Sequence, residues 1–105
     1  MDKKLVLQAK KHDKEAFVKL VENYQMSMYK TAIAILQNDE DAADAIQETI
    51  LICWEKIGSL RNAKFFKTWM TRILIHRCYA IYNENKRTVT ADNFPDIMDL
   101  SLIHI

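Results

Sequence analysis

Apolar residues recur at steps of three and four along most of this chain, which is the spacing of one face of an α-helix. The longest such stripe comprises Phe17, Leu20, Val21, Tyr24, Met28, Ala32 and Ile35. It predicts an amphipathic helix that is capped by Asp13 and ends near Leu36. A shorter helix is expected before it, from the N-cap Asp2 to about Lys11.

Two further stripes predict two more long helices. The first comprises Ala42, Ala45, Ile46, Thr49, Ile50, Cys53 and Ile57, and it follows the polar joint at residues 37–40. Asp39 or Asp41 is expected to cap this helix, and Gly58 falls where a helix C-terminus favours glycine. The second follows the loop Ser59–Lys64, fades near Asn85, and comprises Phe66, Trp69, Met70, Ile73, Leu74, Arg77 and Ile81.

The composition supports helices throughout, because the 105 residues include one glycine and one proline, whereas sheets need turns rich in both. Half of the residues are apolar, which is enough to form a core. The sequence therefore predicts an all-α bundle of three long helices and a short N-terminal helix over residues 1–87. Residues 88–105 hold the proline and no clear period, and are expected to be a linker or disordered tail.

The net charge of +1 conceals two neighbouring segments of opposite charge. Residues 37–57 carry six acidic residues and one lysine, a net charge of −5. Residues 58–87 carry seven basic residues and one glutamate, a net charge of +6. Adjacent helices of opposite sign indicate two different partners.

The remaining chemistry is sparse. Cys53 and Cys78 lie inside helical patterns, so free buried thiols in a reducing cytoplasm are favoured over a disulfide or a reactive site. The histidines have no metal-ligand spacing, and no signal peptide or membrane-spanning stretch is apparent. We expect a cytoplasmic protein with no metal, no cofactor and no membrane contact of its own.

A family resemblance rests on the order of residues. Residues 41–57 read DAADAIQETILICWEKI, which resembles region 2.2 of the extracytoplasmic-function (ECF) sigma factors. The residues that resemble regions 2.3 and 2.4 of the same class are Leu60-Arg61, Phe66, Thr68-Trp69-Met70 and Arg72-Ile73. Those that resemble region 2.1 are Ala16-Phe17, Tyr24, Tyr29 and Ala32. The resemblance covers roughly residues 12–87. The family also has a C-terminal helix-turn-helix domain, which we do not expect within these 105 residues, so the sequence is either a fragment or a stand-alone domain.

The resemblance implies a transcription initiation factor, without a catalytic site, that binds core RNA polymerase and recognises and helps melt the promoter minus-ten element. It also implies an anti-sigma factor as a partner. Docking on the β′ clamp helices is expected from Asp41, Asp44, Gln47, Glu48 and Trp54. A solvated helix face is the alternative for the polar residues, and a core position is the alternative for Trp54.

The resemblance also implies contact with the non-template strand of promoter DNA. The residues expected to make it are Arg61, Asn62, Ala63, Lys64 and Phe65 in the loop, and Lys67, Arg72, His76 and Arg77 in the last helix. Phe66 and Trp69 are expected to pack inward. His76 stands where the family usually has Asn, and Ala80 where it often has Asp, so the base preference stays open.

A different function remains possible from the sequence alone. A sigma-like helical module that binds polymerase or a regulator without reading DNA would share the acidic helix. Such a module has no need of the basic last helix, so the +6 segment favours the DNA-binding interpretation. No nucleophile–base pair or carboxylate pair indicates an enzyme.

Overall fold

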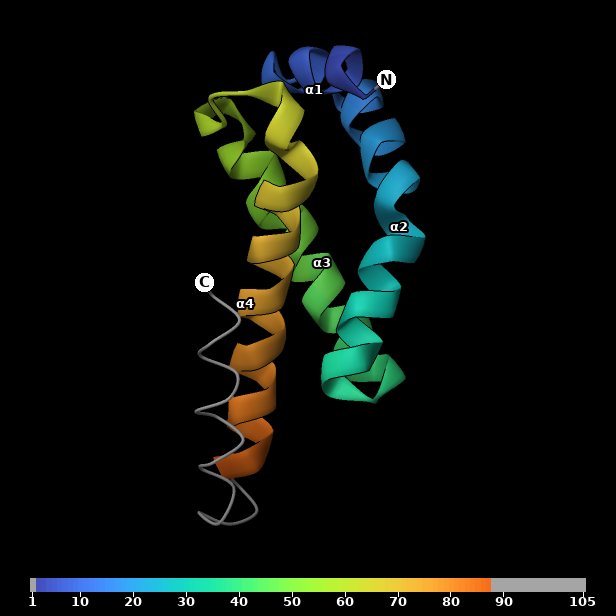
Figure 1. Cartoon of the computed structure of the whole chain (residues 1–105), viewed down its shortest axis with the longest axis vertical. Helices are drawn as coiled ribbons and strands as arrows, with labels where there is room; N and C mark the ends of the chain where they lie inside the picture. The colour runs from blue at the N-terminus through green and yellow to red at the C-terminus, as the bar shows by residue number, and fades with distance from the viewer. Residues whose placement is uncertain (1, 88–105) are drawn as a thin grey trace.

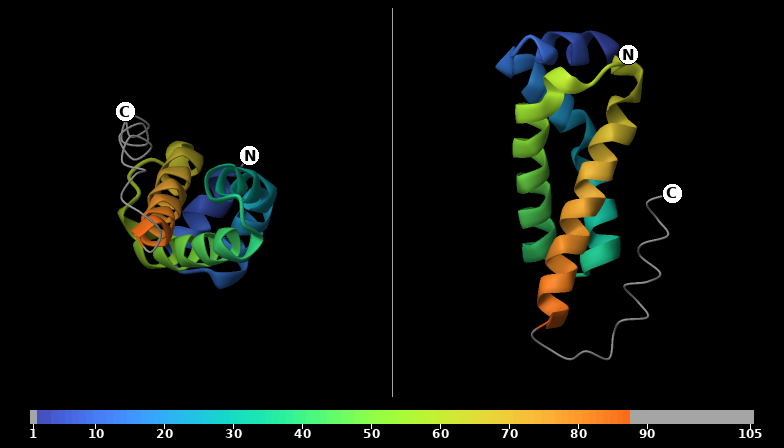
Figure 2. Two further views of the ribbon diagram at one scale, coloured as in Figure 1. Left: turned by 90° about the horizontal axis from the view of Figure 1, so that it is seen from below. Right: turned by 90° about the vertical axis from the view of Figure 1, so that its left-hand side faces the viewer.

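The computed structural model describes residues 2–87, which form three long helices and a short one (Figure 1). The elements are α1 (Lys3–Lys10), α2 (Lys14–Leu36), α3 (Asp39–Lys56), the 3₁₀ turns η1 (Ile57–Ser59) and η2 (Ala63–Phe65), and α4 (Phe66–Arg87). Helices α2, α3 and α4 form the bundle, and α1 lies across one end of it (Figures 1 and 2). The predicted all-α architecture is confirmed, whereas the predicted tail at 88–105 lies outside the described residues.

The break between α1 and α2 has the expected cause. His12 adopts a left-handed backbone conformation with φ of 67°, which ends the first helix. The side chain of Asp13 then accepts a hydrogen bond from the backbone N–H of Ala16 at 3.2 Å. Asp13 is therefore the N-cap of α2, as predicted.

The prediction that Asp39 or Asp41 caps α3 is wrong. Asn38 is the N-cap, and its side-chain oxygen accepts from the N–H of Asp41 at 2.8 Å. The backbone of Asn38 is extended, as an N-cap requires, whereas Asp39 and Asp41 already lie in the first helical turn. There their charges are favoured by the helix dipole.

Two other helix ends also differ from expectation. Asp2 precedes α1, but its side chain does not cap that helix. The carboxylate instead accepts hydrogen bonds from the Tyr24 hydroxyl and, at 3.4 Å, from the Asn23 amide, and so ties α1 to α2. Gly58 lies in η1 without a positive φ. Among residues 2–87, the C-cap residue with a left-handed backbone is Gln37, with φ of 55° after α2.

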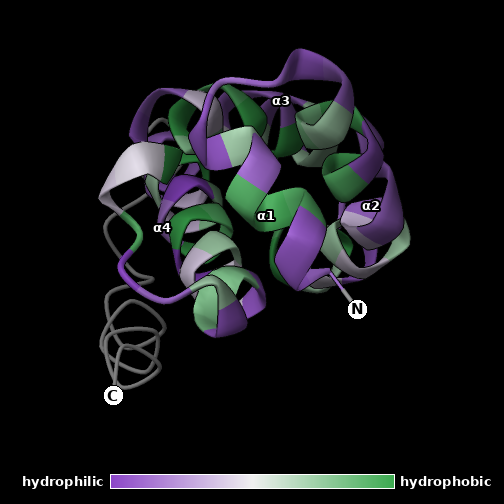
Figure 3. Ribbon diagram, turned by 90° about the horizontal axis from the view of Figure 1, so that it is seen from above, coloured by the Kyte–Doolittle hydropathy of each residue, from purple (hydrophilic) through white to green (hydrophobic). Residues whose placement is uncertain are grey.

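The core combines large residues from α2 and α4 with small residues from α3. Among the largest fully buried side chains are Leu20 and Met28 of α2 and Phe66, Met70 and Leu74 of α4. The buried residues of α3 are all small, namely Ala42, Ala45, Thr49 and Cys53. Seen along the bundle, α1 closes its end and contributes Val6 and Ala9 to the core (Figure 3).

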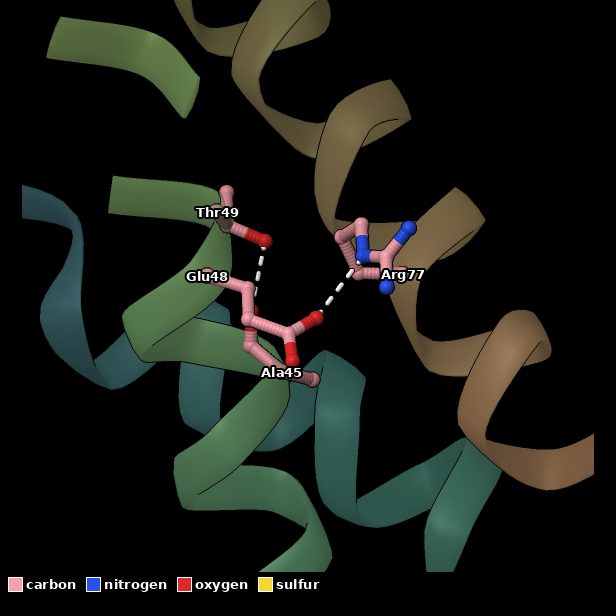
Figure 4. A network of polar contacts seen from close by, with 4 residues as sticks. All are labelled: Ala45, Glu48, Thr49 and Arg77. Atoms are coloured by element: carbon pink, nitrogen blue, oxygen red, sulfur yellow. Dashed lines mark hydrogen bonds and ion pairs between the residues drawn. The ribbon is translucent and has the colours of Figure 1, made fainter. Parts of the chain in front are cut away.

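The core contains two buried thiols and the buried hydroxyl of Thr49. Cys53 and Cys78 are free and buried, as predicted. Burial raises the pKa of the Cys53 thiol to about 12 and that of Cys78 to about 11, so both remain protonated and unreactive at neutral pH. The Thr49 hydroxyl donates to the Ala45 carbonyl at 2.7 Å (Figure 4). None of the helices in residues 2–87 has the length and hydropathy needed to span a bilayer.

Candidate nucleic-acid interface and docking face

The exposed side of α3 carries a strip of three residues, Asp44, Gln47 and Leu51, which we call the outer strip. These positions recur at three- and four-residue steps, so they share one helix face. Asp44 and Gln47 are exposed, and Leu51 is 59% exposed. A large apolar side chain thus lies in a polar, acidic surface. Leu51 is not among the residues predicted to dock, although its position outside the buried stripe of this helix was a signal.

A groove runs beside the outer strip, between α2 and α3. It is lined by Glu22, Gln25, Met26, Tyr29, Asp39, Ala43, Ile46, Gln47 and Ile50. Met26 is 67% exposed, and the Tyr29 hydroxyl donates to Asp39 Oδ1 at 2.7 Å. That hydrogen bond is the main reason why the pKa of Tyr29 is raised. The groove therefore offers apolar surface with an acidic rim.

Three of the five residues predicted to dock on polymerase have partners within the fold. Glu48 accepts from Arg77 Nε at 2.8 Å (Figure 4). Asp41 accepts from Asn85 Nδ2 at 2.9 Å. Both contacts join α3 to α4. Trp54 is partly buried at the edge of the core, where its ring centroid lies 5.1 Å from that of Phe17.

The loop predicted to contact DNA contains the turn η2. Asn62 organises it, because its side-chain oxygen accepts from the N–H of Lys64 at 2.9 Å and its carbonyl from the N–H of Phe65 at 2.9 Å. Arg61, Lys64 and Phe65 are exposed, and Phe65 is 54% exposed. An exposed phenylalanine ring beside exposed cations offers a stacking surface and positive charge, which suits a flat, anionic ligand.

A first pocket, which we call the aromatic pocket, lies on one side of η2. Its lining comprises Leu60, Phe65, Thr68, Trp69, Arg72, Ile73 and His76. Trp69 is partly buried and packs with its ring centroid 5.9 Å from that of Phe66, which is buried. The inward packing of Phe66 is confirmed, while Trp69 both packs against the core and lines this pocket.

A second pocket, which we call the lysine pocket, contains other residues of the same turn. Its lining comprises Asp2, Lys3, Tyr24, Asn62, Ala63, Lys64, Phe66 and Lys67. Burial and the hydrogen bond to Asp2 raise the pKa of Tyr24 to about 12, so its hydroxyl remains a donor. The structure thus brings together Asn62, Lys64 and Lys67, as the sequence suggested, and adds α1, which nothing in the sequence pattern places there.

Arg77 is the one predicted DNA-contacting residue that faces α3. It lines neither pocket and is held by Glu48. Its place within the apolar stripe of the last helix was the available signal. Within residues 2–87, no three His, Cys, Asp or Glu side chains come together as a metal-ligand set.

The sequence of the helical bundle matches a known protein family. Residues 20–88 match the model of Sigma-70 region 2, which is more than half of the chain. The chain belongs to the Sigma-70 region 2 family. The resemblance stated from the sequence motifs is thereby confirmed.

The relatives of this region 2 domain include ECF sigma factors. It is 34% identical over 73 residues to the ECF RNA polymerase sigma factor SigW of Bacillus subtilis, which covers 70% of this chain and 39% of that protein. It is 31% identical over 75 residues to the RNA polymerase sigma-H factor of Pseudomonas aeruginosa, covering 71% of this chain and 39% of that protein. The chain therefore spans well under half the length of these two relatives.

A solved region 2 has the same fold. The NMR structure of an engineered region 2 of sigmaE in complex with GTAAAA superimposes with a TM-score of 0.76 and 25% identity, covering 85% of this chain and 93% of that one. The α2–α4 bundle of the present domain, with η2 at the start of α4, is therefore the region 2 fold.

Proposed function

We propose that this chain is the promoter-reading and polymerase-docking domain of an ECF sigma factor. In this proposal it acts in transcription initiation rather than as an enzyme. The observation that carries the proposal is the aromatic pocket, which is lined by the exposed Phe65 and by Trp69, Arg72 and His76. The related region 2 of sigmaE was solved in complex with GTAAAA, which supports a nucleic-acid ligand for this chain.

The chemistry of the pocket suits a base that has left the stack. Opening a base pair loses stacking worth about 1.4 kcal/mol per step. Stacking on an aromatic side chain returns about 1–3 kcal/mol per base. One captured base beside Phe65 therefore offsets the opening of one step, while Arg72 attracts the phosphate backbone. His76 can donate or accept a hydrogen bond to a base edge.

For core RNA polymerase we propose the outer strip as the centre of docking. Asp44 and Gln47 supply carboxylate and amide groups that can pair with arginines, and Leu51 supplies an apolar anchor. Asp41, Glu48 and Trp54 each have a partner within the fold, so in this proposal they contribute less to docking than the outer strip. The groove between α2 and α3 extends the same surface and is the place we propose for a regulatory protein such as an anti-sigma factor.

The second candidate is a protein-interaction module that binds polymerase or a regulator without reading DNA. The exposed Met26 and Leu51 favour it, because both lie on the α2–α3 side and neither lines the aromatic or lysine pocket. The two candidates differ in what they predict for single-stranded DNA.

Fluorescence anisotropy with a labelled non-template minus-ten oligonucleotide tests the proposal. The chain is mixed with core RNA polymerase, and binding is compared with that of a scrambled oligonucleotide of equal length and composition. Preferential binding of the promoter strand supports promoter reading. Equal binding of both strands, with core polymerase still bound, would leave the interaction module as the function.

A further inference from the structure

The lysine pocket brings α1 together with a part of the chain that lies far along the sequence, namely η2 and the start of α4. Helix α1 supplies Lys3, η2 supplies Lys64, and α4 supplies Lys67. Helix α1 is held in place by Val6 and Ala9, which are fully buried, and by the hydrogen bonds of Asp2 to α2. The position of Lys3 beside η2 is therefore a fixed feature of the fold.

The pocket has an excess of positive charge. Three ammonium groups face one carboxylate, that of Asp2, which accepts hydrogen bonds from Tyr24 and Asn23. None of Lys3, Lys64 and Lys67 forms an ion pair within residues 2–87. Lysines that outnumber the acidic residues around them repel one another and favour an anion between them. The ammonium group of lysine is a common phosphate ligand.

We propose that Lys3 of α1 binds a phosphate together with Lys64 and Lys67, so that the N-terminal helix belongs to the nucleic-acid interface. This proposal rests on the function proposed above. The two pockets share η2, with Phe65 in the aromatic pocket and its neighbours Lys64 and Phe66 in the lysine pocket. A strand that places a base against Phe65 therefore brings its backbone past the three lysines.

The test compares two neighbouring lysines of α1. Lys3 lines the pocket, whereas Lys4 is exposed on the same helix and does not. Binding of the labelled non-template oligonucleotide by the chain with core polymerase is measured at several salt concentrations for Lys3→Ala, Lys4→Ala and Lys3→Arg. We expect Lys3→Ala to weaken binding about two- to fivefold, the range of one exposed charge pair. The slope of log K against log salt should flatten by about 0.7, the value for one phosphate of a single strand.

Lys3→Arg should restore the slope, and Lys4→Ala should leave it unchanged. Equal effects of Lys3→Ala and Lys4→Ala would overturn the proposal, because they would reflect only the general charge of α1. In that case the wild-type preference for the promoter strand over the scrambled strand would still stand, so failure here is distinct from failure of the proposed function. Circular dichroism and melting temperature establish that each variant is folded.

The same phosphate chemistry could come from a free nucleotide. ATP and inorganic phosphate are therefore titrated against the chain without DNA, with the tyrosine fluorescence and the amide NMR signals of residues 62–67 as readouts. Weak or absent binding of both, below the affinity for the oligonucleotide, supports the strand as the ligand. Saturable binding of ATP that Lys3→Ala abolishes, at an affinity at or above that of the oligonucleotide, would overturn the assignment to the strand.

Discussion

Arg77 donates from Nε to Glu48 Oε1 at 2.8 Å, and this contact joins the basic helix α4 to the acidic helix α3 (Figure 4). The side chains of Arg77 and Glu48 are 38% and 44% exposed, so solvent screens the pair. Asn85 and Asp41 form a second contact between the same two helices. The helix proposed to read DNA is thus held at a fixed position against the helix proposed to dock on polymerase.

The Glu48–Arg77 pair should contribute modestly to stability and little to DNA binding. Urea unfolding of Glu48→Ala, Arg77→Ala and the double variant should give a coupling free energy of about 0.5 kcal/mol, as for exposed ion pairs. Arg77→Ala should leave the salt slope of oligonucleotide binding unchanged, whereas Arg72→Ala should flatten it. A flattened slope for Arg77→Ala would show that Arg77 contacts phosphate directly.

Charge reversal on the outer strip should weaken polymerase binding. Asp44→Lys should lower the affinity for core enzyme about tenfold, about 1.4 kcal/mol, because it places a cation where an arginine partner is expected. Surface plasmon resonance measures the affinity, and circular dichroism checks that the domain stays helical. The matched control is Glu15→Lys, an exposed acid on α2 away from the strip. Equal affinities for the two variants would remove Asp44 from the interface.

Two adjacent phenylalanines should have separable roles. Phe65 is exposed and lines the aromatic pocket, whereas Phe66 is buried in the core. Phe65→Ala should weaken oligonucleotide binding by about 1–3 kcal/mol of lost stacking with little change in stability. Phe66→Ala should lower the free energy of unfolding by about 3–5 kcal/mol. Thermal melts and anisotropy titrations on both variants measure the two effects; a stability loss for Phe65→Ala would contradict the assignment.

His76 should affect which bases are preferred more than the overall affinity. It lines the aromatic pocket where an imidazole can meet a base edge. His76→Asn retains hydrogen-bonding capacity but changes its geometry, so a panel of minus-ten oligonucleotides with single base changes should be re-ranked. A uniform loss on every oligonucleotide would instead indicate a phosphate contact or a packing role.

Tyr24 should make stability depend on alkaline pH. Its hydroxyl ionises near pH 10 in the unfolded chain but near 12 in the fold, because burial and the hydrogen bond to Asp2 favour the protonated form. The stability from Tyr24 is therefore fully present below pH 10 and is lost as the pH rises toward about 12. Urea unfolding of the wild type and of Tyr24→Phe at several pH values measures the free energy of unfolding of each. The difference between these two free energies should shrink as the pH rises over that range. A constant difference would argue against the Asp2 contact.

The sequence predicted the helices well because their stability comes from apolar stripes that are visible along the chain. The boundaries of α2 and the buried positions of Phe66 and Cys53 follow directly from that periodicity. The N-cap of α3 does not follow from the periodicity. Asn38 and Asp39 are both good N-cap residues, and only the backbone conformation decides between them. Side-chain preference alone could not make that choice.

The candidate site was predictable only in part, for a related reason. Periodicity shows which residues share a face of one helix, but not which residues of another helix lie opposite. Thus Glu48 and Arg77 were assigned to different partners, although they bind each other. In the same way, no local pattern indicates that α1 crosses the end of the bundle and brings Lys3 to η2.

The small buried residues of α3 have a consequence for engineering new partner specificity. Because Ala42, Ala45 and Thr49 are buried beneath the helix, larger residues there would push α2 and α4 apart and disturb both proposed binding surfaces at once. The opposite side of α3, with Asp44 and Leu51, carries no such constraint. Exchanging the exposed residues of α3 for those of another sigma factor should therefore change which partner the domain binds. The buried residues of α3 would be kept unchanged to preserve the fold.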